Sequence, residues 1–314
     1  MLFSAMAIVA NANAQDYPVK PIRMIVGVTP GGATDILARS VGMRLSEVFK
    51  QQVVIENRPG ANHIVGGEIT ARSPKDGYTL QMIPEGFVIN ASMYAKLPFD
   101  PVKDFSPIAI VALVPNVLVV HPSLPVRNVK QFIALARSRP GQLSYGSSSV
   151  GSPSHMSGEL FAVMAKVNYV HVPYKGQALA LTDLMGGHIH IFFSNPVNVA
   201  AQIRSGRLRA IAVTGQSRTP AFPDVPTFAE QGVPGMKLSN WQGVGGPAGI
   251  PKNIVNRIAA EIQKLAARPD TKEKLNKVGF EPYFNGPEQT TEMLKADIVK
   301  YAKIIKDANI KVEQ

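Results

Sequence analysis

The chain has 314 residues, of which 45% are hydrophobic and 18% charged, and its formal net charge is +11. It contains no cysteine, which excludes disulfides, thiol nucleophiles, zinc–cysteine sites and iron–sulfur clusters held by this chain. The length is enough for about two domains. The lysines and arginines are scattered, without basic runs or interleaved aromatic residues, so we do not expect a nucleic-acid partner.

The amino terminus predicts export. Residues 1–14 are mostly small and apolar and end in Ala12-Asn13-Ala14, which matches the hydrophobic region and A-x-A cleavage site of a signal peptide. The positively charged first region of such a peptide is missing, which indicates a truncated start. No later run reaches the roughly 20 apolar residues that a membrane span needs, so we expect an exported protein that is not membrane-embedded.

The stretch from Ile22 to Asp35 predicts a strand, a glycine turn and a helix. Its apolar run breaks at Pro30-Gly31-Gly32 and restarts at Thr34 in helical period. In an α/β sheet such a turn lies at the carboxyl end of the strand, where ligands bind, and the first N–H groups of the helix lack partners. The stretch therefore predicts an anion site, with a plain strand-to-helix turn as the alternative.

Strand and helix patterns alternate along the rest of the chain. They predict helices at 34–50, 64–73, 89–97, 129–138, 153–165, 177–185, 198–205, 251–267 and 287–307, and strands at 52–56, 78–83, 143–146, 168–172, 189–193 and 208–213. This alternation indicates doubly wound, mostly parallel sheets. The apolar stretch 108–120 is interrupted at Pro115-Asn116, as expected for two collinear strands that cross between lobes, and a return crossing is expected near 239–244.

A second strand–loop–helix unit repeats the pattern of the first. The polar loop Ser147 to His155 follows a short strand, with Ser152 placed as helix N-cap and Pro153 at the first helical position. If the two units lie on facing lobes, an anion between them can meet two helix starts at once.

Other constellations are weaker. The serines of 147–149 do not fit the G-x-S-x-G pattern of hydrolases, although a spatial triad stays open. His188 and His190 lie on one face of a predicted strand, but no acidic residue or cysteine is nearby to complete a metal site. No phosphate or dinucleotide motif is present, so we expect neither a cofactor nor a metal. Trp241 is equally suited to core or hinge packing and to lining a cleft.

Seven motifs in register resemble the Bug-type receptors, the periplasmic substrate-binding proteins of tripartite tricarboxylate transporters. The motifs begin at Tyr17-Pro18, Pro30-Gly31-Gly32, Val54-Ile55-Glu56-Asn57, Asp76-Gly77-Tyr78, Pro98-Phe99-Asp100-Pro101, Val170-His171-Val172-Pro173 and Pro223-Asp224-Val225-Pro226. Together they cover essentially the whole chain from Tyr17 to Lys311.

The resemblance implies an α/β two-lobe periplasmic binding protein, a type II-like Venus flytrap without catalysis. Each lobe would hold a mostly parallel sheet flanked by helices, with two crossing strands as the hinge. Lobe I would comprise 15–114 and 241–314, and lobe II 115–240. The implied function is to capture a small carboxylate, largely through backbone amides and waters, and to deliver it as a monomer to the membrane permease. A ligand sensor that feeds a signalling partner and an exported serine hydrolase are the alternatives.

Two departures from the family pattern bear on the ligand. Where the family commonly has Thr/Ser-Gly-Thr-His, this chain has Pro84-Glu85-Gly86-Phe87, and where an Asp often follows the strand at 189–193, it has Ser194 before Asn195. The resemblance then favours a plain mono- or dicarboxylate, aromatic if Phe87 meets it, over an amino acid. The candidate ligand-binding residues are Pro30, Gly31, Gly32, Ala33, Thr34, Asp35, Glu85, Phe87, Ser147, Ser148, Gly151, Ser152, Ser154, His155, Ser194, Asn195 and Trp241.

Overall fold

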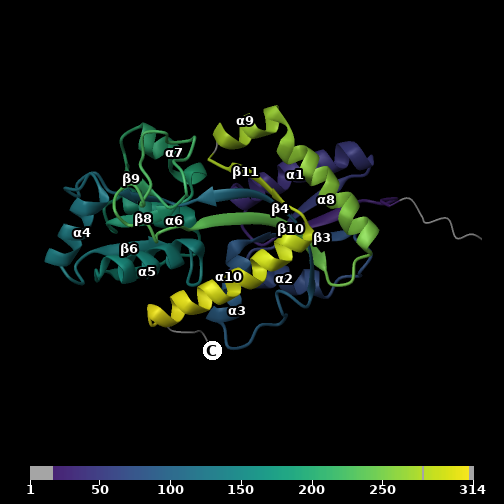
Figure 1. The fold of residues 1–314 in the computed structure, drawn as a ribbon, viewed down its shortest axis with the longest axis horizontal. Helices are drawn as coiled ribbons and strands as arrows, with labels where there is room; N and C mark the ends of the chain where they lie inside the picture. Colours follow the sequence, from purple (N-terminus) through teal and green to yellow (C-terminus); the bar gives the residue numbers. More distant parts are fainter. Residues whose placement is uncertain (1–16, 278, 311–314) are drawn as a thin grey trace, which may run out of the picture.

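A computed structural model describes residues 17–277 and 279–310, so the predicted signal peptide at 1–14 lies outside the described residues. The molecule is elongated and has two lobes, each built on one sheet, with two strands passing between them (Figure 1). None of the helices in the described part is long and apolar enough to cross a membrane.

The lobe I sheet has six strands in the order β11-β4-β10-β3-β1-β2. Their bounds are β1 Ile22–Val26, β2 Val53–Asn57, β3 Thr79–Pro84, β4 Phe105–Pro115, β10 Ser239–Pro247 and β11 Glu281–Asn285. Strands β1 to β4 run in one direction, whereas β10 and β11 run against them. The sheet is therefore mixed: four of its six strands share one direction, but three of its five neighbouring pairs are antiparallel, so it is less parallel than the sequence predicts.

The lobe II sheet has five strands in the order β7-β6-β8-β5-β9. Their bounds are β5 Val117–Val120, β6 Ser144–Ser147, β7 Val170–Pro173, β8 Ile191–Ser194 and β9 Arg209–Val213. Strand β5 runs against its two neighbours β8 and β9, and the other pairs are parallel. Its fully apolar sequence suits a strand that is buried on both faces.

Helices cover both faces of the lobe I sheet. On one face, α1 (Ala33–Phe49) and α8 (Lys252–Ala267) pack on alternate strand residues such as Met24 and Val26. On the other face lie α2 (Ile64–Ala71), α3 (Glu85–Met93) and α10 (Pro287–Asp307), around Phe87 and Trp241. The short α9 (Pro269–Lys277) follows α8. The apolar residues Leu37, Val41 and Leu45 recur at helical spacing on α1, which is why this helix buries one side.

The lobe II sheet is covered in the same way. Helices α4 (Val129–Ser138) and α5 (Pro153–Ala165) pack on the face of Leu118 and Val120, whereas α6 (Gln177–Met185) and α7 (Pro196–Arg204) pack on the face of Val117 and Val119. The two faces alternate along β5 because successive strand residues point to opposite sides.

The crossings lie side by side and are tied by polar groups. Asn116 is the single residue between β4 and β5, and its N–H donates to Thr214 Oγ1 at 2.9 Å. On the return crossing, the N–H of Leu238 donates to the Thr214 carbonyl at 3.1 Å, and Asn240 Nδ2 donates to Asn116 Oδ1 at 3.0 Å. The two crossings predicted at 115–116 and 239–244 therefore form one hydrogen-bonded hinge.

Helix α10 packs against both lobes. Its residue Leu294 lies in the lobe I core with Phe87 and Trp241, whereas Tyr301 and Ile304 belong to the lobe II core. Figure 1 shows α10, in yellow, lying across the side of the molecule that also carries α3 and α5.

Most predicted elements occur within a few residues of their expected positions, but one helix is shifted and two further elements occur. The helix expected at 89–97 begins at Glu85, directly after β3, because Pro84 ends the strand with ψ 167° and also serves as the helix N-cap. Helix α9 and strand β11 were not expected from the sequence.

Candidate functional site

The carboxyl ends of six strands point into the space between the lobes. Strand β4 runs directly into β5, so β1 to β3, which share its direction, end toward lobe II. Strands β6 to β8 run against β5 and therefore end toward lobe I. The loops after these six strands are where an α/β protein binds its ligand.

The loop after β1 presents bare backbone. Gly31 has φ +89°, and Gly32 is the N-cap of α1 with no side chain capping the helix. A Cβ on Gly31 would meet nothing within 4 Å, and one on Gly32 would meet only the Thr29 carbonyl oxygen at 4.0 Å. The N–H groups of Ala33 and Thr34 have no intrahelical partner, nor another among the described residues. This loop can therefore donate to an anion.

Asp35 holds this loop in place. Its carboxylate accepts hydrogen bonds from the N–H of Gly31 at 2.9 Å, from Asn57 Nδ2 at 2.9 Å, and from Arg39 Nε and Nη2 at 3.0 and 3.1 Å. Burial alone would raise the pKa of Asp35, but the bonds from Arg39, Gly31 and Asn57 hold it below its usual value. The side chain is 3% exposed, so Asp35 orders the loop from the buried side.

The other predicted residues of this loop differ in their surroundings. Pro30 is exposed, and Ala33 is buried in the lobe I core. Thr34 Oγ1 donates to Gln242 Oε1 at 2.9 Å, which links the start of α1 to the return strand β10.

The loop after β6 satisfies much of its own backbone. Ser152 is the N-cap of α5 as predicted, and its Oγ accepts from the N–H of His155 at 3.3 Å. The N–H of Gly151 donates to His155 Nδ1 at 3.1 Å, and that of Ser148 donates to Ser154 Oγ at 3.0 Å. The N–H groups of 149, 150 and 154 have no partner within the described residues, so lobe II can offer these amides.

A buried aromatic stack supports this loop. The rings of His155 and His171 are 4.1 Å apart and nearly parallel, and Tyr145 stacks on His171 at 4.7 Å. Burial lowers the pKa of His155 to about 3, with His171 adding to the effect, and burial lowers that of His171 to about 4. Both imidazoles are neutral near pH 7.

Ser147 and His171 form a serine–histidine pair without the features of a nucleophile. Ser147 Oγ lies 2.6 Å from His171 Nε2 and is within hydrogen-bonding distance of the Ser149 carbonyl, but Ser147 is fully buried. The nearby carboxylate, Glu159, lies 3.8 Å from His155 Nε2 instead of orienting His171. The pair therefore braces the loop and does not meet the geometry of a catalytic triad.

The end of β8 carries polar residues and no acidic residue. Ser194 is fully buried and its Oγ donates to Gln177 Oε1 at 3.1 Å. Asn195 is the N-cap position of α7, but its side chain caps no helix amide and has no hydrogen-bond partner in the described part of the chain. Its amide is available at the cleft end of lobe II.

Three predicted side chains are fully buried and held by neighbouring groups. Phe87 is fully buried and stacks on Phe99 with ring centroids 5.2 Å apart. Trp241 is also fully buried, and its Nε1 donates to Asp297 Oδ2 at 2.6 Å. Glu85 Oε1 lies 3.3 Å from Lys300 Nζ on α10. Each side chain is held by packing or charge within lobe I, and the expectation that the three meet the ligand stays a prediction.

The loop after β2 was not among the predicted site residues. Ala61, Asn62 and His63 all have positive φ, and the His63 ring fills the space beside Gly27 and Gly86 at the ends of β1 and β3. Burial lowers the pKa of His63 to about 4. The signal in the sequence that could have indicated this loop is the short connection between β2 and α2, because β2 pairs with β1, the strand that precedes the first glycine loop.

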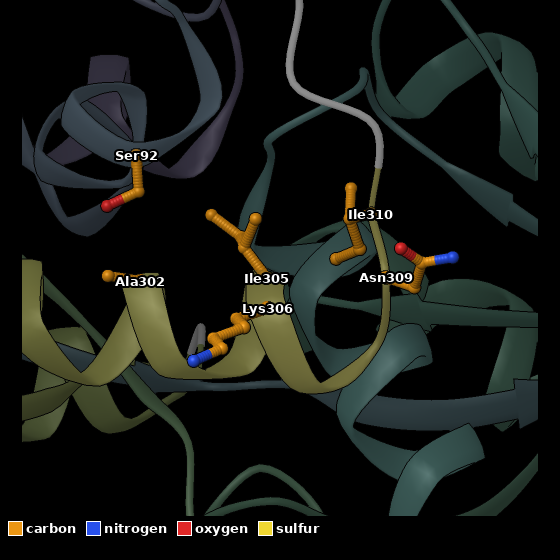
Figure 2. Close-up of a pocket in the computed structure, with 6 residues that line it drawn as sticks. All are labelled: Ser92, Ala302, Ile305, Lys306, Asn309 and Ile310. Atoms are coloured by element: carbon orange, nitrogen blue, oxygen red, sulfur yellow. The ribbon is translucent and has the colours of Figure 1, made fainter.

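Other features lie outside the six loops. No three metal-ligating side chains gather within residues 17–277 and 279–310, and His190 Nδ1 accepts from the Ser144 N–H at 3.0 Å. A surface hollow near the end of α10 is lined by Ile305, Lys306 and Ser92 of α3, and includes no loop at a strand end (Figure 2).

Comparison with known proteins decides the family. The model of the tripartite tricarboxylate transporter family receptor, TctC, matches residues 37–310. The chain belongs to this receptor family. Protein BugT of Bordetella pertussis is 33% identical over 98% of this chain and 94% of its own length. The resemblance drawn from the sequence motifs is thereby confirmed, and the chain is a binding protein and not an enzyme.

Solved structures of similar proteins share the two-lobe fold. Rpa4515 of R. palustris, determined with adipate, is 37% identical with a TM-score of 0.89, covering 94% of this chain and 99% of that one. MatC of Rhodopseudomonas palustris, with bound malate, is 27% identical with a TM-score of 0.82, covering 92% of this chain and 100% of that one. These matches confirm the α/β periplasmic binding protein fold.

Proposed function

We propose that this receptor captures an aliphatic dicarboxylate between its lobes and delivers it to the membrane permease subunits of a tripartite tricarboxylate transporter. The observation that carries the proposal is the unpartnered amide donors on both sides of the cleft, at Gly32 to Thr34 in lobe I and at 149–150 in lobe II. Carboxylates bind well to such amides because the bonds are charge-assisted and the helix dipole adds to them.

The placement of the two helix starts favours two carboxylates over one. Helix α1 lies on one side of the lobe I sheet, whereas α5 lies on the side of α3 and α10. Figure 1 shows α1 and α8 above the sheets and α5, α10 and α3 below them. A ligand that meets both starts lies obliquely across the cleft, which suits an anion with a charge at each end. The adipate and malate of the two related structures are of this class.

The side chains around the loops argue against other ligands. Phe87 and Trp241 are buried, so no aromatic ring among them is available to stack on an aromatic acid. The carboxylate of Asp35 is paired with Arg39, and that of Glu85 is paired with Lys300. At the end of β8 the polar groups are Ser194 and Asn195. No carboxylate at these positions is placed to pair with the ammonium group of an amino acid.

A ligand screen tests this proposal. We expect succinate, malate, glutarate and adipate to include at least one acid that raises the melting temperature, because a ligand at 100 times its Kd stabilises the folded state by about 2.7 kcal/mol. The half-amide of the best acid, benzoate and aspartate serve as matched controls, and calorimetry gives the affinities. Equal stabilisation by the half-amide, or none by any diacid, would overturn the assignment.

Delivery, location and lobe boundaries are part of the same proposal. We place the receptor in the periplasm as a monomer, exported by the segment 1–14, with lobe I formed by 15–114 and 241–314 and lobe II by 115–240. The sheet membership of the strands supports this division. Uptake of the labelled diacid by cells that carry the permease should require this chain, and unchanged uptake after its deletion would favour a sensor instead.

A further inference from the structure

The loop after β2 has an unusual backbone. Ala61, Asn62 and His63 have φ values of +42°, +46° and +76° in succession, directly after Gly60. Residues with a Cβ adopt this left-handed region at a cost in free energy, and runs of them persist only where surrounding contacts hold them. Such conformations gather at ligand clamps and switch regions, which directs attention to what these side chains contact.

Hydrogen bonds hold the loop within lobe I. Asn90 Nδ2 on α3 donates to the Asn62 carbonyl at 2.6 Å, and Asn62 Nδ2 lies 2.9 Å from Asn90 Oδ1. Asn62 Nδ2 is also 3.2 Å from the Gly86 carbonyl. The His63 ring fills the space beside Gly27 and Gly86. The left-handed run thus presents the Asn62 amide at the rim of lobe I.

The same amide reaches the other lobe. Asn62 Nδ2 donates to the carbonyl oxygen of Gly151 at 3.1 Å, in the loop between β6 and α5. Gly151 has φ +73°, and a Cβ on it would lie 3.2 Å from Met93 Cγ of α3 and 3.6 Å from Asn62 Nδ2. Gly151 is the residue whose own N–H is held by His155. Asn62 therefore contacts lobe II at the loop that offers its amides to the ligand.

We propose that Asn62 is a positioning residue that clasps the lobes together: its side-chain amide holds the Gly151 carbonyl and so sets the place of the lobe II loop when the cleft closes. The contact joins the two lobes away from the hinge strands, so an opening rotation breaks it. It consequently favours the closed arrangement even without ligand, and it slows release of a bound ligand.

The left-handed φ provides a clean test variant. In Asn62→Gly the side chain is lost together with its bonds to Asn90 Oδ1 and Gly86. The backbone conformation becomes easier, and the bond from Asn90 Nδ2 to the carbonyl of residue 62 remains, so we expect the loop and the fold to be retained. The matched control is Ala61→Gly, which gives the same backbone relief one residue earlier, at an exposed position, and leaves the clasp intact. Melting temperatures of both variants check that each is folded.

The closing experiment measures the lobes directly, without ligand. The chain has no cysteine, so spin labels can be attached at Val54→Cys and Val170→Cys, two exposed positions on the edge strands β2 and β7. Electron–electron distances between the two labels are measured in the protein with the original loop, in Ala61→Gly and in Asn62→Gly, and their distribution gives the fraction of closed molecules. We expect Asn62→Gly to lower the ratio of closed to open molecules about five-fold, the effect of one net hydrogen bond, and Ala61→Gly to leave it unchanged. Equal distributions in the two variants would overturn the clasp.

A second measurement uses adipate as the probe. Stopped-flow binding should show a faster dissociation rate for Asn62→Gly, by about five-fold, with an association rate close to that of Ala61→Gly. An unchanged dissociation rate would also count against the clasp. The ligand-free distances do not depend on which anion binds, so a failure of adipate to bind would bear on the proposed function and leave the clasp to the distance measurement.

Discussion

The amides at the start of α1 are fixed in place by their own loop. Asp35 accepts hydrogen bonds from Gly31, Asn57 and Arg39, and Thr34 is tied to Gln242 of the return strand. A loop held in this way needs little reordering when an anion arrives, which preserves affinity that ordering would otherwise remove. The charged residue of the motif thus acts on the loop, and the bare glycine backbone is left for the ligand contact that we propose.

Gly32 allows this to be tested at a single residue. Its φ of −79° suits any side chain, and a Cβ there would meet only the Thr29 carbonyl at 4.0 Å. We therefore expect Gly32→Val to fold with a melting temperature within a few degrees of the original, and to lose dicarboxylate binding by at least about 100-fold, because the branched side chain blocks close approach to the amides. Gly32→Ala should show a smaller loss. Unchanged affinity in the valine variant, measured by calorimetry, would mean that the loop is only a turn.

The sequence identified the glycine loop correctly as a strand–turn–helix unit but could not assign the directions of single side chains. Phe87 and Trp241 are compatible with a cleft by type and position, yet both are fully buried against α10 and its neighbours. Their direction depends on contacts with Leu294 and Asp297, about fifty residues or more away in sequence. Asn62 was missed for the same reason, because its partner Gly151 lies on the other lobe.

At the scale of elements, local patterns were enough for most of the chain. Helix α4, which has a clear apolar stripe, and helix α5, which begins with the N-cap Ser152 and Pro153, occur at their predicted bounds, 129–138 and 153–165. Helix α9 was missed because it is polar and buries only Thr271 and Leu275 among its described side chains. Strand β11 was missed because it is a short edge strand with Pro282 in it, and such a strand depends on pairing with β4 for its identity.

The N-caps of α4 and α5 form a matched pair for separating stability from binding. Ser152 Oγ accepts from the N–H of His155, and Asn128 Oδ1 accepts from that of Gln131. Loss of either cap should lower the free energy of unfolding by about 1 kcal/mol. Because α5 follows the cleft loop and α4 does not, Ser152→Ala should also weaken dicarboxylate binding, whereas Asn128→Ala should not. Denaturant unfolding and calorimetry measure the two effects, and equal affinities in the two variants would exclude a role of the α5 cap in binding.

The two lobes are joined by more than the crossing strands. On α10, Lys300 Nζ lies 2.6 Å from Asp297 Oδ1 and 3.3 Å from Glu85 Oε1, and Asp297 accepts from the indole of Trp241 in β10. This chain of groups connects α3, α10 and the return strand at a place where α10 also enters the lobe II core. Burial raises the pKa of Glu85 to about 7 despite the attraction of Lys300, so this carboxyl is partly protonated near pH 7.

Buried titratable groups in both lobes make the stability of the whole molecule depend on pH. The pKa values of His63, His155 and His171 fall from 6.5 to about 4, 3 and 4 through burial. The unfolded chain binds these protons at a higher pH than the folded chain does. The three histidines therefore leave the free energy of unfolding unchanged above pH 6.5 and lower it as the pH falls, by about 2 kcal/mol for each group at pH 5. Glu85 acts in the opposite direction, because its raised pKa lets the native state take up a proton between about pH 7 and 4.5.

Burial also raises the pKa values of Glu159 and Glu281, but the three histidines and Glu85 carry the largest shifts among the carboxyl and imidazole groups. Because the histidines outweigh Glu85, acid should destabilise the protein. We expect the free energy of unfolding to fall by about 4 kcal/mol from pH 7 to pH 5, and by about 6 kcal/mol in Glu85→Gln, where the opposing proton uptake is gone. Denaturant unfolding at the two pH values measures both changes. A smaller fall in Glu85→Gln than in the original chain would mean that Glu85 is already ionised at pH 5 in the native state, held so by Lys300. Equal stability at pH 5 and 7 in both proteins would instead mean that the three imidazoles take up protons in the folded state, and the stack beneath the lobe II loop would then carry charge.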